Sequence, residues 1–241
     1  MTHRDLARVC AVGCGVILLA GCGSSSSKTT PAASGSPLAS PSATPASVAQ
    51  LQKIVLQPSD LPTGWKGAPF KANPNHVADQ AALVKCVGAR NTDSDKVAEA
   101  HSEDFALRDV RISSSASTYR SPSDIDADLV MMHSPKLSSC FDQLMKKTLA
   151  TTMPAGIKIA SSSIKITPGS AGGPANVVAT GTGTIEVSVN GQQVPFYVSV
   201  AYITGPLIEA EVDTFNAGSP VPASVVNPLV ATVAARASKG V

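Results

Sequence analysis

The stretch from Thr184 to Phe215, TIEVSVNGQQVPFYVSVAYITGPLIEAEVDTF, decides the fold. Apolar and polar residues alternate along three parts of it, and a period of two is typical of a half-buried β-strand. Asn190-Gly191 separates the first part from the second, and this pair is the strongest short hairpin signal because both residues tolerate a positive φ. A second turn falls at Gly205-Pro206. The stretch therefore predicts an antiparallel meander.

The alternation also assigns a face to each side chain of the meander. On the middle strand, one face is expected to hold Phe196, Val198, Val200 and Tyr202. The last strand is expected to turn its apolar residues inward and its acidic residues outward, with Ile208, Ala210 and Val212 on one face and Glu209, Glu211 and Asp213 on the other.

Helical patterns dominate the residues before the meander. Ser134-Pro135 opens the clearest one, because apolar residues then recur at spacings of three and four: Leu137, Cys140, Phe141, Leu144 and Met145. Further helices are predicted over Val48–Leu56, Asp79–Val87 and Ser94–Ser102, after Ser121-Pro122, and at the end of the chain with Asn227 as cap and Pro228 in the first turn. Val110–Tyr119 is predicted to be a strand. The fold class is therefore α+β, an antiparallel sheet packed with helices, without the long parallel crossovers of a doubly wound fold.

Composition excludes two classes of protein. Lys and Arg total 19 against 17 Asp and Glu, a net charge of +2, so the chain has no basic excess with which to bind nucleic acid. A multi-span membrane protein is excluded because only one apolar run, Val9–Ala20, approaches the length of a membrane helix, and it is too short to span a bilayer.

The first 21 residues have the order of a secretory signal peptide. Arg4 and Arg8 precede the apolar run, which leads into Leu19-Ala20-Gly21-Cys22. This ending resembles the lipobox of bacterial lipoproteins. The resemblance implies cleavage before Cys22, a diacylglycerol on its sulfur and anchoring of the chain to the outer side of the cell membrane. The alternative is an ordinary signal peptide in which the cysteine is a coincidence.

Residues 22–47 are predicted to form a lipidated, disordered tether. From Gly23 to Ser47, every residue except Lys28 and Leu38 is Ser, Pro, Ala, Gly or Thr, and such a composition cannot bury enough apolar surface to fold. Residues 48–241 are long enough for one sizeable core and are predicted to form a single extracytoplasmic α+β domain.

The cysteines indicate one disulfide bond. Cys10 and Cys14 leave with the signal peptide and Cys22 takes the lipid, so Cys86 and Cys140 remain in an oxidising compartment. We predict a bond between them that joins two helices; the alternative is a pair of buried free thiols. A redox enzyme is not indicated, because the sequence has no C-x-x-C motif.

The lipobox, the Ser/Pro-rich tether, the Leu-Pro-x-Gly-Trp turn at Leu61–Trp65 and the Cys86/Cys140 pair together resemble a group of mycobacterial surface lipoproteins. They are also similar to the extracellular sensor domains of mycobacterial serine/threonine kinases. The resemblance covers most of residues 48–238. It implies an α+β domain with a cleft, a binding or sensing role and no enzymatic activity.

Candidate catalytic and metal-binding residues are few. His76, His101 and His133 lie far apart in sequence without a second ligand at metal spacing, and no G-x-S-x-G motif presents a serine nucleophile. The acidic residues Asp124, Asp126 and Asp128 are interpreted as a solvated helix surface. Gly181-Thr182-Gly183 lacks the third glycine of a dinucleotide-binding motif and is interpreted as a bulge or a close backbone approach, and Trp65 as a packing residue.

The sequence thus predicts a non-catalytic, lipid-anchored envelope protein without metal or cofactor, which binds a protein partner or an apolar lipid ligand through residues that the sequence does not identify. One alternative is an accessory or sensor domain that acts on another envelope protein. Another is an envelope hydrolase, which requires His76, His101 or His133 beside a serine or aspartate in a cleft.

Overall fold

The computed structural model describes residues 44–152, 157–169, 176–189 and 191–240. The predicted signal peptide, Cys22 and the tether up to residue 43 lie outside the described residues. The helices are α2 (Val48–Leu51), α3 (His76–Val87), α4 (Pro122–Met132), α5 (Leu137–Thr152) and α6 (Ala223–Ser238). The strands are β1 (Lys66–Ala68), β2 (Lys96–His101), β3 (Asp104–Leu107), β4 (Val110–Tyr119), β5 (Ile157–Pro168), β6 (Val177–Val189), β7 (Gln192–Gly205) and β8 (Ile208–Ala217). Short 3-10 turns occupy Pro58–Asp60 and Asp93–Asp95.

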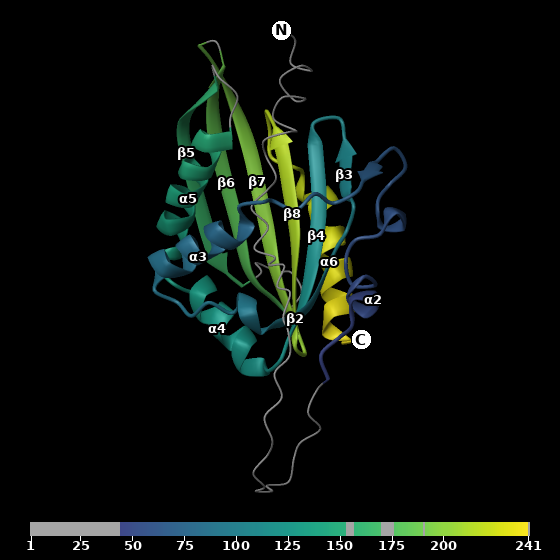
Figure 1. The fold of residues 1–241 in the computed structure, drawn as a ribbon. Helices are drawn as coiled ribbons and strands as arrows, with labels where there is room; N and C mark the ends of the chain where they lie inside the picture. The colour runs from purple at the N-terminus through teal and green to yellow at the C-terminus, as the bar shows by residue number, and fades with distance from the viewer. Residues whose placement is uncertain (1–43, 153–156, 170–175, 190, 241) are drawn as a thin grey trace, which may run out of the picture.

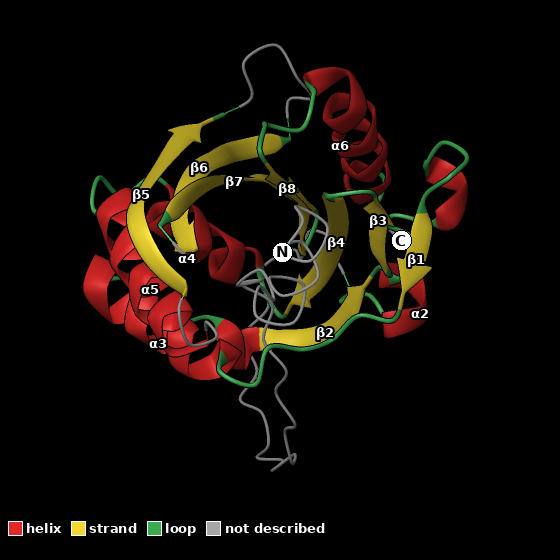
Figure 2. Cartoon of the chain, turned by 90° about the horizontal axis from the view of Figure 1, so that it is seen from above, coloured by secondary structure: helices red, strands yellow, loops and turns green. Residues whose placement is uncertain are grey.

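The eight strands form one antiparallel sheet in the order β1-β3-β4-β8-β7-β6-β5, and β2 also pairs with β4. One edge of β4 therefore pairs first with β3 and then with β2. The long strands run side by side through the molecule (Figure 1). Seen from above, they curve into an arc, and α3 and α5 lie between its two ends, β5 and β2 (Figure 2).

Helices cover both faces of the sheet, and each face has its own apolar core. We call the face covered by α3, α4 and α5 the inner face and the face covered by α2 and α6 the outer face. The inner core includes Leu83, Met131, Leu137, Leu144, Ile185, Phe196 and Phe215. The outer core includes Leu51, Phe105, Ile112, Ile203, Ile208, Val212 and Val233.

The structure confirms the α+β fold and the predicted meander. β6, β7 and β8 follow one another as antiparallel neighbours, and Val189 pairs with Gln192 across the first turn. Gly191 in that turn has a φ of 82°, which only glycine adopts readily; its neighbour Asn190 is not among the described residues. The paired glycines were interpreted as a bulge or a close backbone approach; at Gly181 the close neighbour is a side chain, since a Cβ there would lie 2.7 Å from Val200 Cγ1.

Two predicted elements were wrong. Ser94–Ser102 was expected to be helical, but Lys96–His101 is strand β2, because its backbone pairs with β4 and long-range pairing prevails over local preference. The last helix begins at Ala223, so Pro228 lies inside it rather than in its first turn. Pro228 has no N–H to bond the Ser224 carbonyl, a loss that water can make good because both residues are exposed.

A disulfide bond joins Cys86 near the end of α3 to Cys140 in α5, as predicted. It fixes the two helices that lie between the ends of the sheet. Gly88 ends α3 in the left-handed conformation that a helix C-terminus favours. Within the described ranges, no helix has the length and apolar character needed to cross a membrane.

Candidate functional site

Strand β8 places three carboxyl groups in a row on the inner face. Because side chains alternate along a strand, Glu209, Glu211 and Asp213 all lie on the side opposite the outer-core residues of β8. Glu211 and Asp213 are buried and Glu209 is partly buried. The prediction that these residues face solvent was therefore wrong, because the sheet is covered on both faces. We call these three residues the carboxylate row.

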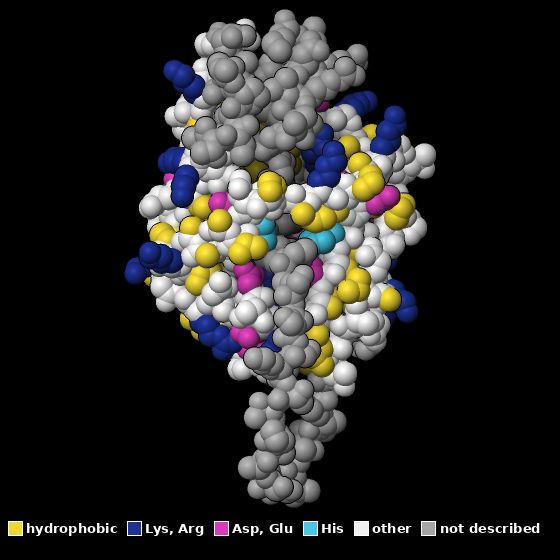
Figure 3. Space-filling view, in the orientation of Figure 1, with side chains coloured by type: hydrophobic (Ala, Val, Ile, Leu, Met, Phe, Trp, Pro, Cys, Tyr) yellow, Lys and Arg dark blue, Asp and Glu magenta, His cyan; other side chains and the backbone are white. Residues whose placement is uncertain are grey.

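The strands beside β8 extend this polar region. On β4, the residues paired with the carboxylate row carry hydroxyl groups: Ser117 opposite Glu209, Ser115 opposite Glu211 and Ser113 opposite Asp213. On β2, Glu99 and His101 pair with two of these serines. In the space-filling view, histidine side chains reach the surface near the centre of the molecule, with acidic side chains close by (Figure 3).

A hydrogen-bonded cluster closes one end of the row. The Tyr119 hydroxyl donates to Glu209 Oε2 at 2.7 Å, and the Thr92 hydroxyl donates to Asp128 Oδ1 at 2.6 Å. The ammonium of Lys96 lies 3.1 Å from Asp93 Oδ1. Burial alone would lower the pKa of Lys96, but Asp93, Glu99 and Glu209 outweigh burial and hold it above its ordinary value. Lys96 is therefore a fixed positive charge beside the row.

Burial raises the pKa of every carboxyl in the row. Burial and then the charge of Asp128 raise the pKa of Glu209 to about 7. Burial and then the charge of Asp104 raise the pKa of Asp213 to about 8. For Glu211, burial and then the charge of Asp213 raise the pKa well above its ordinary value. Two members of the row, Glu209 and Asp213, therefore have pKa values close to neutral pH.

Several polar atoms of the row, of β2 and of α3 are buried without a hydrogen-bond partner. They include Asp213 Oδ2 of the row, His101 Nδ1 on β2, and His76 Nε2 and Gln80 Oε1, which lie one turn apart on α3. His76 belongs to the same electrostatic neighbourhood, since burial, then Lys96, hold its pKa below its ordinary value. An unpaired buried polar atom costs about 1–3 kcal/mol, so each of these atoms calls for a partner.

The three histidines have different surroundings. His76 is buried, and His101 stacks on Phe70 at a ring distance of 3.8 Å with its Nε2 3.4 Å from Glu99. His133 is exposed and lies at the C-cap of α4. Among the described residues, no imidazole is hydrogen-bonded to a serine hydroxyl, and no group of three His, Cys, Asp or Glu side chains could hold a metal ion.

The structure also shows the surroundings of Trp65 and of the three aspartates of α4. Trp65 is partly buried against the outer core, as predicted. Asp126 is exposed, but Asp124 and Asp128 are buried, which corrects the interpretation of all three as a solvated surface. Asp124 accepts from Arg90 and Ser121, and Asp128 accepts from Thr92. Cys22, the predicted lipidation site, lies outside the described residues.

Sequence reasoning did not identify the carboxylate row as a site. A signal was present in the two strands that build it: IEAEVD in β8 and the serine-rich RISSSAS in β4. The first alternates acidic and apolar residues, and the second is rich in small polar residues. Only their pairing in the centre of a sheet covered on both faces shows that these polar residues are interior.

Comparison with known proteins gives structural similarity without a match in sequence. No protein-family model matches the chain, and no curated protein matches it. Among solved structures, the extracellular domain of PknH from Mycobacterium tuberculosis is similar, with a TM-score of 0.44 and 10% sequence identity over 80% of this chain and 97% of that one.

Proposed function

We propose that this chain is a non-catalytic, extracytoplasmic binding protein, anchored by a lipid on Cys22, that binds a small organic cation on the inner face of its sheet. One observation carries the ligand class: buried polar atoms without partners lie in the carboxylate row itself and on β2 and α3, two elements on the same side of the sheet. The amide oxygen of Gln80 and an ionised Asp213 accept hydrogen bonds, so the partner they lack is a donor.

The chemistry of the row favours a cation over the apolar ligand that the sequence suggested. An amine or guanidinium carries several N–H donors and a positive charge, and carboxylates bind such groups through short, charge-assisted hydrogen bonds. Binding would also convert carboxyl groups with raised pKa values into carboxylates and offset their burial. An apolar ligand would leave the same groups without partners.

Thermal unfolding of the full chain in detergent tests the ligand class. Spermidine and arginine are expected to raise the melting temperature, and citrate, which carries the opposite charge, is not. Asp213→Asn is expected to abolish the shift, because the amide cannot pair with an ammonium group as a charged carboxylate does. Glu186→Gln is the matched control. Glu186 lies on the outer face of β6, away from the carboxylate row, and accepts a hydrogen bond from the Ser161 hydroxyl. Equal shifts in both variants would contradict the proposal.

The lipid anchor has its own test. Cys22→Ser removes the sulfur to which the diacylglycerol is attached, so acyl labelling is expected to disappear and the chain to leave the membrane fraction. Two or more acyl chains hold a protein stably at a bilayer, whereas a protein without an acyl chain makes only weak contacts with it. Labelling and membrane partitioning that both persist in Cys22→Ser would contradict the anchor.

A further inference from the structure

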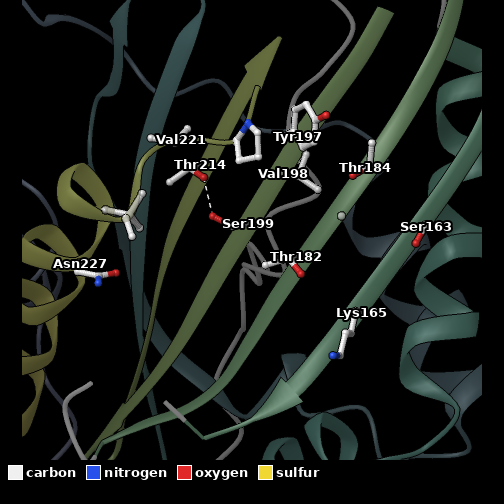
Figure 4. Close-up of a pocket in the computed structure, with 14 residues that line it drawn as sticks. Ser163, Lys165, Thr182, Thr184, Tyr197, Val198, Ser199, Thr214, Val221 and Asn227 are labelled. Carbon is white, nitrogen blue, oxygen red and sulfur yellow. Dashed lines mark hydrogen bonds between the residues drawn. The ribbon is translucent and has the colours of Figure 1, made fainter. Parts of the chain in front are cut away.

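A groove lies on the outer face of the sheet, on the opposite side from the carboxylate row (Figure 4). Its floor is formed by β5, β6, β7 and β8, and its wall by the segment from Pro220 to Asn227 that leads into α6. The groove has a volume of about 510 Å³. Sites for small molecules commonly occupy about 300–1,000 Å³, so the groove is of ligand size.

The register of the strands lines up polar side chains across the floor. In one row Lys165 pairs with Thr182, Thr182 with Ser199, and Ser199 with Thr214. The adjacent row is Ser163, Thr184 and Tyr197. Neighbouring strands lie about 4.8 Å apart, so hydroxyl groups recur across the floor at this interval. The hydroxyl oxygens of Ser199 and Thr214 are 2.6 Å apart and hydrogen-bonded to each other.

The polar floor lies beside the first turns of α6. Further along the same face of β7, the residues are Ala201 and Ile203, which belong to the outer core. Toward the groove, the same face of β7 carries Ser199 and Tyr197. The change from apolar to hydroxyl side chains along one strand face means that the floor offers hydrogen bonds to a polar ligand.

The groove walls add a different chemistry. Val221 and Asn227 lie across from the hydroxyl groups of Thr182 and Ser199 (Figure 4). Pro220, Val221 and Val226 supply apolar surface, and the amide of Asn227 both donates and accepts hydrogen bonds. The groove thus presents hydroxyl groups on its floor and apolar surface on its wall.

The charge of the groove excludes the ligand class proposed for the inner face. Among the described residues that line it, Lys165 is the only charged one, and none is a carboxylate. A cation would therefore find no counter-charge. Hydroxyl groups both donate and accept, and so do the hydroxyl groups of a sugar. A sugar also has apolar C–H faces that pack against aromatic and aliphatic side chains.

We propose that this groove binds a neutral oligosaccharide of roughly two or three sugar units. Its hydroxyl groups exchange hydrogen bonds with the Thr182–Ser199 row and with Asn227, and its C–H faces lie against Tyr197 and Val221. The proposal is independent of the inner-face site, because the two lie on opposite faces of the sheet and share no residue.

Saturation-transfer NMR and calorimetry with the full chain in detergent test this proposal, with maltotriose, cellotriose and mannotriose as separate probes. Thr182→Val removes a floor hydroxyl without changing side-chain shape, and one lost hydrogen bond is expected to weaken binding about five- to tenfold. Ser199→Ala is the second test variant. Thr167→Val is the matched control, because Thr167 lies exposed on the same face of β5 but outside the groove lining. Melting temperatures establish that each variant is folded.

Binding of at least one trisaccharide that is weakened by Thr182→Val and Ser199→Ala, and unchanged by Thr167→Val, supports the proposal. Binding that none of the three substitutions alters places the sugar elsewhere and overturns it. Absence of binding by all three probes also overturns it. A phosphorylated sugar that binds where the neutral probes fail, and is lost in Lys165→Gln, shows an anion site instead.

Discussion

The hydroxyl of Tyr119 donates a hydrogen bond of 2.7 Å to Glu209, across strands β4 and β8. This bond opposes the other influences on Glu209, because burial and the charge of Asp128 raise its pKa and the tyrosine lowers it. The carboxylate row therefore has a hydrogen-bond donor at one end, where Tyr119 bonds Glu209. Toward the other end, Asp213 Oδ2 has no hydrogen-bond partner.

Tyr119→Phe is expected to raise the pKa of Glu209 further above 7, because the variant loses a donor to the ionised carboxylate. Titration of the glutamate carboxyl carbons by NMR measures the change. Tyr197→Phe is the control, since Tyr197 lines the groove on the outer face, and it is expected to leave Glu209 unchanged. A pKa of Glu209 that stays the same or falls in Tyr119→Phe contradicts the assigned role of the bond.

The stability of the domain is expected to decrease as the pH rises. The folded-state pKa values of Glu209 and Asp213, about 7 and about 8, lie above their unfolded values, so the folded protein binds more protons between about pH 4 and pH 8. Their contribution is complete below the unfolded pKa and is lost as the pH rises through the folded one. The melting temperature is therefore expected to be higher at pH 5.5 than at pH 8.5, by roughly 5 °C or more.

Asp213→Asn checks the origin of this pH dependence. The variant has no charge to bury, so its melting temperature is expected to vary less with pH than that of the wild type. Asp142→Asn on α5 is a control, because the pKa of Asp142 lies below its ordinary value and has the opposite pH dependence. A wild type that becomes more stable from pH 5.5 to pH 8.5 would contradict the buried row.

Arg236 joins α6 to the residues that follow α2, through hydrogen bonds to Asp60 and Val55. Its guanidinium donates to both oxygens of Asp60 at 2.7 and 2.8 Å, and to the Val55 carbonyl at 3.1 Å. Arg236→Lys cannot form both bonds to Asp60 together and is expected to lower the free energy of unfolding by about 1–3 kcal/mol in urea. Lys146→Ala, which breaks the exposed pair with Asp142, is expected to change it by less than about 0.5 kcal/mol. Equal effects would show that the bonds of Arg236 contribute no more than a surface pair.

Loss of the Cys86–Cys140 bond is expected to destabilise the domain strongly. The bond joins residues 54 positions apart, and a loop of that length gives about 4 kcal/mol in the chain-entropy model. Urea unfolding of the Cys86→Ala, Cys140→Ala variant measures this effect. If reductant alters the unfolding midpoint of the wild type and of this double variant equally, the disulfide makes no contribution to stability.

The sequence predicts local features whose causes lie within a few residues. The period of two predicts the meander, and the spacing of three and four predicts α5. Ser121 is the N-cap of α4, as its position suggests, and forms a capping box with Asp124. The disulfide was predicted by counting cysteines, on the expectation that the chain is exported.

The candidate site depends on contacts between distant residues, so local patterns do not predict it. The acidic residues of β8 alternate with apolar ones like those of any half-exposed strand. They are interior because β8 lies between β4 and β7 and α4 brings Asp128 close to Glu209. Contacts between distant residues also explain β2. Its polar sequence suggested a helix, but its backbone pairs with β4.

Calorimetric titration with spermidine, in two buffers of different ionisation enthalpy, tests the central claim most directly. If the cation binds to the carboxylate row, carboxyl groups with raised pKa values ionise on binding, and the complex releases protons at pH 7. We therefore expect a binding enthalpy that depends on the buffer in the wild type and in Glu186→Gln, and no binding in Asp213→Asn. A spermidine affinity that Asp213→Asn leaves intact, with no release of protons, would contradict a cation site on the inner face.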